Sequence, residues 1–373
     1  MMMLVRLSTH VTPARRQEIL AECAALGLFP AVGPEAGAGV KGNTLRLIGE
    51  PSPGHRSKLE DIHGIVAILE AGDARELHER APGAPDTSVR VHGPAPGGVG
   101  IEAAFGAGDV SVIAGPCAAE DPESLLEIAR AVRAAGATLL RGGAFKPRTS
   151  PYSFQGVGKR ALEWLAAARE ATGLGLVTEV LDPRDVEAVG EVCDVFQIGA
   201  RSMTNAALLV EVGRFGKPVL LKRGIAATIR EFLLAAEFVL AQGNEQVILC
   251  ERGVRGFDQV TRNLLDVGGI AHLKRVSHLP VVADPSHAAG RSELVRPLAR
   301  AGLAAGADGL IIEVHPRPDE AHSDARQAIS PGELSRIVDD ARILAGLDGR
   351  RLVLPGGPAE RDPRPSRPVE SIV

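Results

Sequence analysis

Arginine and lysine residues recur at the ends of predicted strands in this sequence. They are Arg141, Lys146 and Arg148 after the second strand, Arg201 after the fourth, Lys222 and Arg223 at the end of the fifth, and Arg252 at the end of the sixth. Any one alone could be an ordinary helix-face charge. Together they indicate a site for a substrate with several negative charges. Guanidinium groups match phosphate and carboxylate, so we expect two phosphates, or a phosphate with a carboxylate.

A second group of residues could bind a metal. Cys117, His287, Glu313 and Asp324 offer a thiolate, an imidazole and two carboxylates. This mixture suits Mn²⁺, Fe²⁺, Co²⁺ or Zn²⁺ better than Mg²⁺ or Ca²⁺, which prefer oxygen ligands. Cys117 follows a predicted strand directly, whereas the other three cysteines (Cys23, Cys193 and Cys250) lie in or beside apolar runs and are interpreted as small core residues.

A strand–helix repeat must position these side chains. The predicted strands are near-continuous apolar runs, and there are eight of them: Val110–Pro116, Thr138–Ala144, Leu174–Val180, Val195–Gly199, Pro218–Lys222, Gln246–Cys250, Pro280–Ala283 and Leu310–Val314. Helical patterns follow them, the weakest being the sixth, near Gln259–Leu265. Apolar parallel strands alternating with helices predict a (β/α)8 barrel, in which the chemistry lies at the C-terminal ends of the strands.

The rest of the chain divides into shorter units. Residues 1–75 show the order βαββαβ of a ferredoxin-like α+β domain, with Thr12 capping the first helix and Pro13 at its first position. Residues 76–100, rich in proline and glycine, predict a linker with a hairpin, and residues 101–350 the barrel. Residues 351–373 form a tail rich in proline and arginine, which we expect to be disordered.

The composition excludes several classes of protein. The 373 residues are 45% hydrophobic and 24% charged, which is typical of a soluble globular enzyme. A net charge of −4 without a long basic block argues against a nucleic-acid partner. No apolar run is long enough to cross a membrane, and the first residues lack the apolar core of a signal peptide. The four cysteines have no paired spacing, which argues against a disulfide scaffold. We therefore expect a cytoplasmic protein.

Several motifs together resemble the 3-deoxy-D-arabino-heptulosonate 7-phosphate (DAHP) synthases, and most closely their type I-beta subfamily, which carries a ferredoxin-like N-terminal domain. The matching stretches are Ile113–Cys117 (IAGPC), Leu140–Gly156 (LRGGAFKPRTSPYSFQG), Gln197–Arg201 (QIGAR), Pro218–Gly224 (PVLLKRG), Ile248–Gly253 (ILCERG), Ala283–His287 (ADPSH), Ile312–Pro316 (IEVHP) and Ser323–Gln327 (SDARQ). The resemblance covers roughly residues 100–345. It implies condensation of phosphoenolpyruvate with erythrose 4-phosphate, the first step of the shikimate pathway to aromatic amino acids.

The resemblance also implies a role for each site residue. Cys117, His287, Glu313 and Asp324 would bind one divalent metal ion. Arg141 and Lys146 would hold the phosphoenolpyruvate carboxylate, and Lys146 would be the main acid/base residue. The phosphate of phosphoenolpyruvate would contact three further cations: Arg201, Lys222 and Arg252. The erythrose 4-phosphate would contact Arg148 and Thr149.

Alternatives stay open at this stage. The sister family makes 3-deoxy-D-manno-octulosonate 8-phosphate from arabinose 5-phosphate, but Lys146–Ser150 (KPRTS) follows the heptulosonate pattern. A non-catalytic barrel that binds anions is a second alternative. By resemblance, residues 1–75 would bind an aromatic amino acid, tyrosine or phenylalanine, as a feedback inhibitor. The alternative is that this domain is an oligomerisation module without a ligand. The family resemblance also implies a homotetramer. His322, two residues before Asp324, departs from the family pattern and could face solvent or act as an alternative ligand.

Overall fold

The structure is a computed structural model and describes residues 2–8, 11–30, 44–48, 54–69, 76–80, 83–94, 100–146, 152, 156–321 and 323–356. Three residues with predicted roles, Arg148, Thr149 and His322, lie outside the described residues, as does the tail from residue 357 onward. Among the described residues, none of the helices combines the length and the apolar character that a membrane crossing requires.

The N-terminal unit is a ferredoxin-like α+β domain. Its elements are β1 (Met2–Leu7), α1 (Pro13–Ala25), β2 (Phe29–Pro30), β3 (Thr44–Ile48), α2 (His55–Glu60) and β4 (Ile65–Leu69), and its antiparallel sheet has the order β2-β3-β1-β4. The predicted cap of α1 is confirmed, since the Thr12 hydroxyl accepts the backbone N–H of Arg15. Buried aliphatic residues and Cys23 fill the core between the sheet and the helices.

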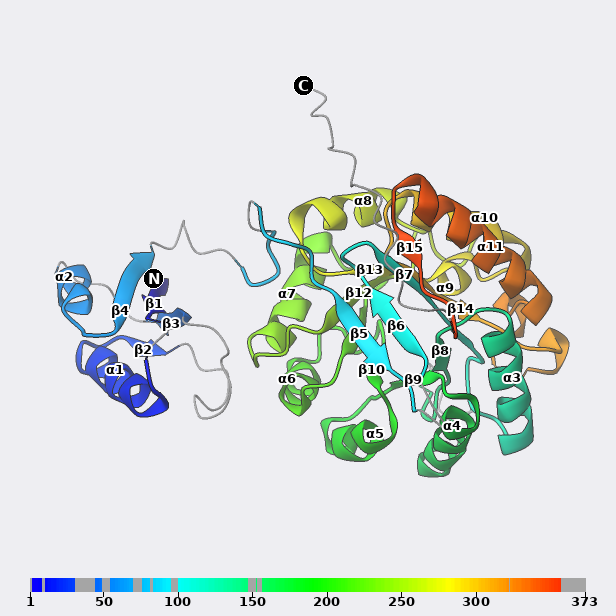
Figure 1. Cartoon of the computed structure of the whole chain (residues 1–373), viewed down its shortest axis with the longest axis horizontal. Helices are drawn as coiled ribbons and strands as arrows, with labels where there is room; N and C mark the ends of the chain where they lie inside the picture. Colours follow the sequence, from blue (N-terminus) through cyan, green and yellow to red (C-terminus); the bar gives the residue numbers. More distant parts are fainter. Residues whose placement is uncertain are drawn as a thin grey trace, which may run out of the picture.

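Parallel strands form the predicted (β/α)8 barrel. The described strands are β7 (Asp109–Gly115), β8 (Leu139–Arg141), β9 (Gly175–Glu179), β10 (Val195–Ile198), β11 (Val219–Lys222), β12 (Val247–Glu251), β13 (Val281–Ala283) and β14 (Gly309–Glu313). Each pairs with the next, and β14 pairs back onto β7, which closes the barrel. Figure 1 shows these strands inside a ring of helices. Both faces of every strand are buried, as the near-continuous apolar runs require.

Several of the outer helices begin where the sequence supplies a side-chain cap. The outer helices are α3 (Pro122–Ala134), α4 (Lys159–Thr172), α5 (Val186–Val192), α6 (Ala206–Phe215), α7 (Ile229–Leu240), α8 (Val267–Val276), α10 (Ser292–Ala304) and α11 (Pro331–Leu347). Thr228 and Glu231 form a capping box at the start of α7. The predicted helix at Gln259–Leu265 is wrong. These residues form a loop, and the helix starts only at Val267, because the Asp266 side chain caps it by accepting the backbone N–H of Gly269.

The predicted linker at residues 76–100 is largely part of the barrel. β5 (Val89–His92) pairs with β6 (Glu102–Phe105), so the hairpin extends beyond residue 100. Val89, Val91 and Phe105 pack against inward-facing strand residues such as Ile113 and Ile311, and the hairpin thereby plugs the N-terminal end of the barrel (Figure 1). The alternation of buried and exposed residues in β5 explains why the hairpin is a covering layer.

Residues before this hairpin are bound to the outside of the barrel. His78 is buried, and its Nδ1 lies 2.7 Å from the Glu237 carboxylate on α7. The Arg80 guanidinium donates to the carbonyls of Lys274 and Ser277, at the end of α8. The segment leading out of the N-terminal domain is therefore fixed at α7 and α8.

The predicted tail also needs correction at its start. β15 (Arg351–Leu352) pairs with β7, and the Arg351 guanidinium contacts the Asp109 carboxylate at 2.9 Å. Val353 donates its backbone N–H to the Val110 carbonyl. Residues 351–353 therefore belong to the barrel, because they satisfy backbone groups at the start of β7.

Candidate active site

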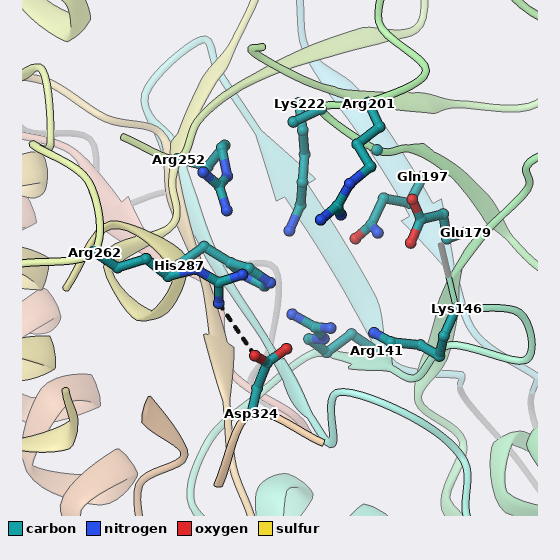
Figure 2. Close-up of a pocket in the computed structure, with 12 residues that line it drawn as sticks. Arg141, Lys146, Glu179, Gln197, Arg201, Lys222, Arg252, Arg262, His287 and Asp324 are labelled. Atoms are coloured by element: carbon teal, nitrogen blue, oxygen red, sulfur yellow. Dashed lines mark hydrogen bonds and ion pairs between the residues drawn. The ribbon is translucent and has the colours of Figure 1, made fainter. Parts of the chain in front are cut away.

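The predicted site residues that the structure describes lie at the C-terminal mouth of the barrel. Cys117 follows β7, Arg141 ends β8, Lys222 ends β11, and Glu313 ends β14. His287 lies in the short helix α9 (Pro285–Ala289), directly after β13. A pocket at this mouth is lined by six cationic side chains, together with His287 and Asp324 (Figure 2): Arg141, Lys146, Arg201, Lys222, Arg252 and Arg262.

Cys117, Glu313 and Asp324 bring their potential ligand atoms within 4.8 Å of one another. The Cys117 thiol donates a hydrogen bond to Asp324 Oδ2 at 2.9 Å. Asp324 has a φ of 57°, in the left-handed region that residues other than glycine rarely adopt. Such backbone strain persists only where the surroundings fix it, and it is concentrated at functional sites.

His287 lies beside this group, next to Glu313. Its Nε2 lies 3.3 Å from Glu313 Oε1, and its Nδ1 lies 2.8 Å from Asp284 Oδ2. Burial lowers the pKa of His287 despite these carboxylates, which favours the neutral imidazole that binds metals. Glu313 Oε1 is buried and finds no hydrogen-bond partner among the described residues. A buried carboxylate oxygen without a hydrogen bond, beside a thiol, an imidazole and a second carboxylate, fits a divalent transition metal.

Lys146 lies directly beside Cys117. Its ammonium group donates to the Cys117 thiol sulfur at 2.8 Å and to the Cys117 carbonyl at 2.9 Å. Burial, together with the Glu313 charge, raises the pKa of the Cys117 thiol to about 12, while Lys146 opposes the rise. Lys146 thus supplies a positive charge that stabilises a thiolate at this position.

Two buried arginines present unpartnered groups to the pocket. Nε and Nη1 of Arg141, and Nη1 of Arg252, have no hydrogen-bond partner within the described part of the chain. Both side chains are more than nine-tenths buried, and the nearest acid to Arg141 is Glu313, at 3.3 Å. Buried guanidinium groups are costly without partners, so their donors fit a bound anion.

The remaining cations differ in their surroundings. Lys222 lines the pocket, but its ammonium group lies 2.7 Å from the Asp284 carboxylate. Arg223, the next residue, pairs with Glu251 at 2.9 Å and with Asp266 at 2.8 Å, and does not line the pocket. Arg223 is therefore a structural cation, although it belonged to the predicted group at the strand ends.

Some residues of the pocket were missed by the sequence predictions. Arg262 lies in the loop that was predicted as a helix, and its Nη1 lies 3.1 Å from Asp324 Oδ1 (Figure 2). Gln197, from β10, also lines the pocket, and its place in the stretch QIGAR is the signal that could have identified it. Glu179, at the end of β9, lines the pocket as well, as the position of a polar residue at a strand end predicts.

Comparison with known proteins agrees with this geometry. The family model described as the DAHP synthetase I family matches residues 88–346. The chain belongs to the DAHP synthetase I family. A phospho-2-dehydro-3-deoxyheptonate aldolase of Thermotoga maritima is 48% identical over 245 residues, which is 66% of this chain and 72% of the relative. A 2-dehydro-3-deoxyphosphooctonate aldolase of Nitratidesulfovibrio vulgaris is 34% identical over 64% of this chain and 92% of its own length.

Solved structures of this family extend the comparison to the fold. The crystal structure of the Thermotoga maritima DAHP synthase is 38% identical, with a TM-score of 0.69, and the match covers 94% of this chain and 99% of that one. A truncated form of the same organism's enzyme gives a TM-score of 0.65 at 41% identity, covering 74% of this chain and 98% of that one. The family model thus covers the barrel, and the match to the first of these structures extends over the preceding domain as well.

Proposed function

We propose that the chain carries out the condensation of its family, joining phosphoenolpyruvate, erythrose 4-phosphate and water to give DAHP and inorganic phosphate, with one divalent metal ion at Cys117, His287, Glu313 and Asp324. The observation that supports this proposal is the position of these donors. They lie at the barrel mouth beside buried arginine groups without partners. Two of the four candidate ligands, His287 and Asp324, also line the pocket of the cations, which supports a reaction between two phosphorylated substrates.

The donor set supports a transition metal. A thiolate and an imidazole with two carboxylates favour Mn²⁺, Fe²⁺, Co²⁺ or Zn²⁺ over Mg²⁺. A metal bound here would supply Lewis acidity toward an aldehyde oxygen.

The cations suit phosphoenolpyruvate. In the proposal, Arg141 and Lys146 hold its carboxylate, while Arg201, Lys222 and Arg252 hold its phosphate. All five line one pocket, and the unpartnered donors of Arg141 and Arg252 support the assignment. Arg148 and Thr149 would contact the phosphate of erythrose 4-phosphate.

The chain's own residues then orient the reactants. Clamping both substrates aligns the methylene carbon of the enol with the aldehyde carbon, and holding reactants in this way supplies several kcal/mol of rate acceleration. A carbon–carbon bond forms, water adds to the enol carbon that bears the phosphate ester, and cleavage of the C–O bond releases phosphate. Lys146, which lines the pocket, is proposed as the main acid/base residue for the protons moved in these steps.

The assay compares two sugars. Phosphate release from phosphoenolpyruvate is measured with erythrose 4-phosphate or with arabinose 5-phosphate, before and after EDTA treatment and after addition of Mn²⁺. We expect turnover with the four-carbon sugar alone, lost on EDTA treatment and restored by the metal. Preference for arabinose 5-phosphate would assign the octulosonate reaction of the more distant relatives instead. Undiminished turnover after complete metal removal would contradict the metal site.

The N-terminal domain is proposed to regulate the barrel. Tyrosine or phenylalanine would bind it and inhibit turnover, and the assembly would be a homotetramer. The packing of residues 76–80 against α7 and α8 supports a coupling path, because the chain leaving this domain is fixed to the catalytic barrel.

A further inference from the structure

Gln327, to which no role has been assigned so far, contacts a candidate metal ligand. Its Nε2 donates to Glu313 Oε2 at 2.6 Å, and its side chain is buried. A hydrogen bond this short to a buried carboxylate oxygen is strong and directional. Gln327 therefore occupies one of the two oxygens of Glu313.

Arg262 makes the corresponding contact with the second carboxylate. Its Nη1 donates to Asp324 Oδ1 at 3.1 Å and also to Gln327 Oε1 at 3.1 Å. A continuous chain of hydrogen bonds thus runs from Glu313 through Gln327 and Arg262 to Asp324. Figure 2 shows the contact between Arg262 and Asp324 at the edge of the pocket.

Gln327 and Arg262 leave one oxygen of each carboxylate for the candidate metal. Glu313 Oε1 lies 3.3 Å from His287 Nε2 and 3.3 Å from Arg141 Nη1, without a hydrogen bond to either. Asp324 Oδ2 accepts the hydrogen bond of the Cys117 thiol. The oxygens that face the thiol and the imidazole are therefore those that Gln327 and Arg262 do not use.

Backbone contacts hold both residues in place. Gln327 belongs to the short turn that starts at Asp324, and its backbone N–H donates to the Asp324 carbonyl. Arg262 donates its backbone N–H to the Ala289 carbonyl, and the neighbouring Asn263 side chain donates to the His287 carbonyl at 3.0 Å. The loop that carries Arg262 is thus attached to the helix that carries His287.

We propose that Gln327 and Arg262 are positioning residues that determine which oxygen Glu313 and Asp324 offer to the metal, and so set the geometry and affinity of the site. The inference rests on the proposed metal site. Partners of this kind around metal-binding carboxylates contribute about 10–100-fold in metal affinity or activity. The linked contacts also predict that the two residues act together, so the effects of their replacement will not be additive.

Co²⁺ binding to the metal-free full-length protein tests the proposal without reference to turnover. Co²⁺ bound to a thiolate gives a charge-transfer absorption in the near ultraviolet and ligand-field bands in the visible range. The variants are Gln327→Met, Arg262→Met, the double variant, and Arg262→Lys as the conservative replacement. Arg255→Met is the matched control, since Arg255 is an exposed arginine of the same loop that does not line the pocket.

We expect Gln327→Met and Arg262→Met each to weaken Co²⁺ binding by about 10–100-fold and to change the ligand-field bands, while the charge-transfer band of Cys117 is retained. Arg262→Lys should recover part of the affinity, and Arg255→Met should match the wild type. The Co²⁺ affinity of the double variant should fall by a smaller factor than the product of the two factors measured for the single variants. Thermal melting of the metal-free variants identifies any that fail to fold. Because Arg262 is partly exposed, Arg262→Met should fold and still test the proposal if Gln327→Met unfolds.

The outcomes separate two failures. If the wild-type protein binds Co²⁺ without a thiolate band, the proposed metal site itself is wrong. If the wild type shows the band but folded Arg262→Met binds with the same affinity and spectrum, the positioning role is overturned.

Discussion

The Asp284 carboxylate lies 2.8 Å from Nδ1 of His287. A proton on Nδ1 would face this carboxylate, and Nε2 would then be the lone-pair nitrogen. Nε2 is also the ring nitrogen that lies 3.3 Å from Glu313 Oε1, on the side of the candidate metal ligands. The negative charge of this buried carboxylate thus favours the tautomer that carries its proton on Nδ1 and offers Nε2.

Replacing Asp284 with asparagine should weaken metal binding by about 10–100-fold, since the carboxylate that orients His287 is lost. The melting temperature should also fall, because the buried Lys222 loses the carboxylate 2.7 Å away. Titration calorimetry and thermal melting measure the two effects. Asp308→Asn is the matched control: Asp308 is equally buried and pairs with Lys274 at 2.7 Å, but lies at the other end of the barrel. It should lower the melting temperature only, and equal loss of metal binding in both variants would refute the orienting role.

Metal binding should release a proton from Cys117. Burial raises the pKa of this thiol to about 12, so the group is protonated at neutral pH, whereas a metal ligand must be a thiolate. Below that pKa, affinity should therefore rise about tenfold for each pH unit as the pH increases. Calorimetry in buffers of different ionisation enthalpy counts the protons. Metal binding to the Cys117→Ser variant should release about one proton fewer than binding to the wild type. An identical number of released protons would exclude the thiol as a ligand.

The barrel was predictable because it depends on local signals. Apolar runs separated by helical patterns indicate a parallel barrel, and the barrel places residues such as Cys117 and Glu313 at one mouth. The direction of individual side chains was not predictable. Lys222 and Arg223 are neighbours in sequence, yet one lines the pocket and the other pairs with Glu251 and Asp266.

Long-range contacts explain the other errors. Arg351 pairs with Asp109, 242 residues away, and no local pattern indicates that a short strand will cover the start of β7. The roles of Gln327 and Arg262 depend on distances across loops, which a single sequence does not contain.

The hairpin at the closed end of the barrel should be essential for stability. Phe105 is fully buried there and packs against inward-facing strand residues. Phe105→Ala should lower the free energy of unfolding by about 3–5 kcal/mol, because the cavity cannot close around it. Phe257→Ala, at a fully exposed phenylalanine, should change it by less than about 0.5 kcal/mol. Denaturant unfolding measures both, and a small effect at Phe105 would show that the hairpin is dispensable.

Deletion of the N-terminal domain tests regulation. A chain that starts at Glu76 keeps the contact of His78 with Glu237 and the hairpin, so the barrel should remain folded and active. We expect tyrosine or phenylalanine to inhibit the full chain but not the shortened one. Initial-rate assays with each amino acid check this expectation. If neither amino acid affects the full chain, regulation by these effectors is excluded.

Arg252 and Arg223 form a matched pair of buried arginines with different expected roles. Arg252 lines the pocket and has an unpartnered Nη1 within the described structure, whereas Arg223 is neutralised by two carboxylates. Arg252→Met should raise the KM for phosphoenolpyruvate at least tenfold, since a charge-assisted contact contributes about 1.5–3 kcal/mol. The melting temperature of this variant should change little. Arg223→Met should instead lower the melting temperature, because it leaves Glu251 buried without its partner. Steady-state kinetics and thermal melting distinguish the two, and a reversed pattern would remove Arg252 from the phosphate site.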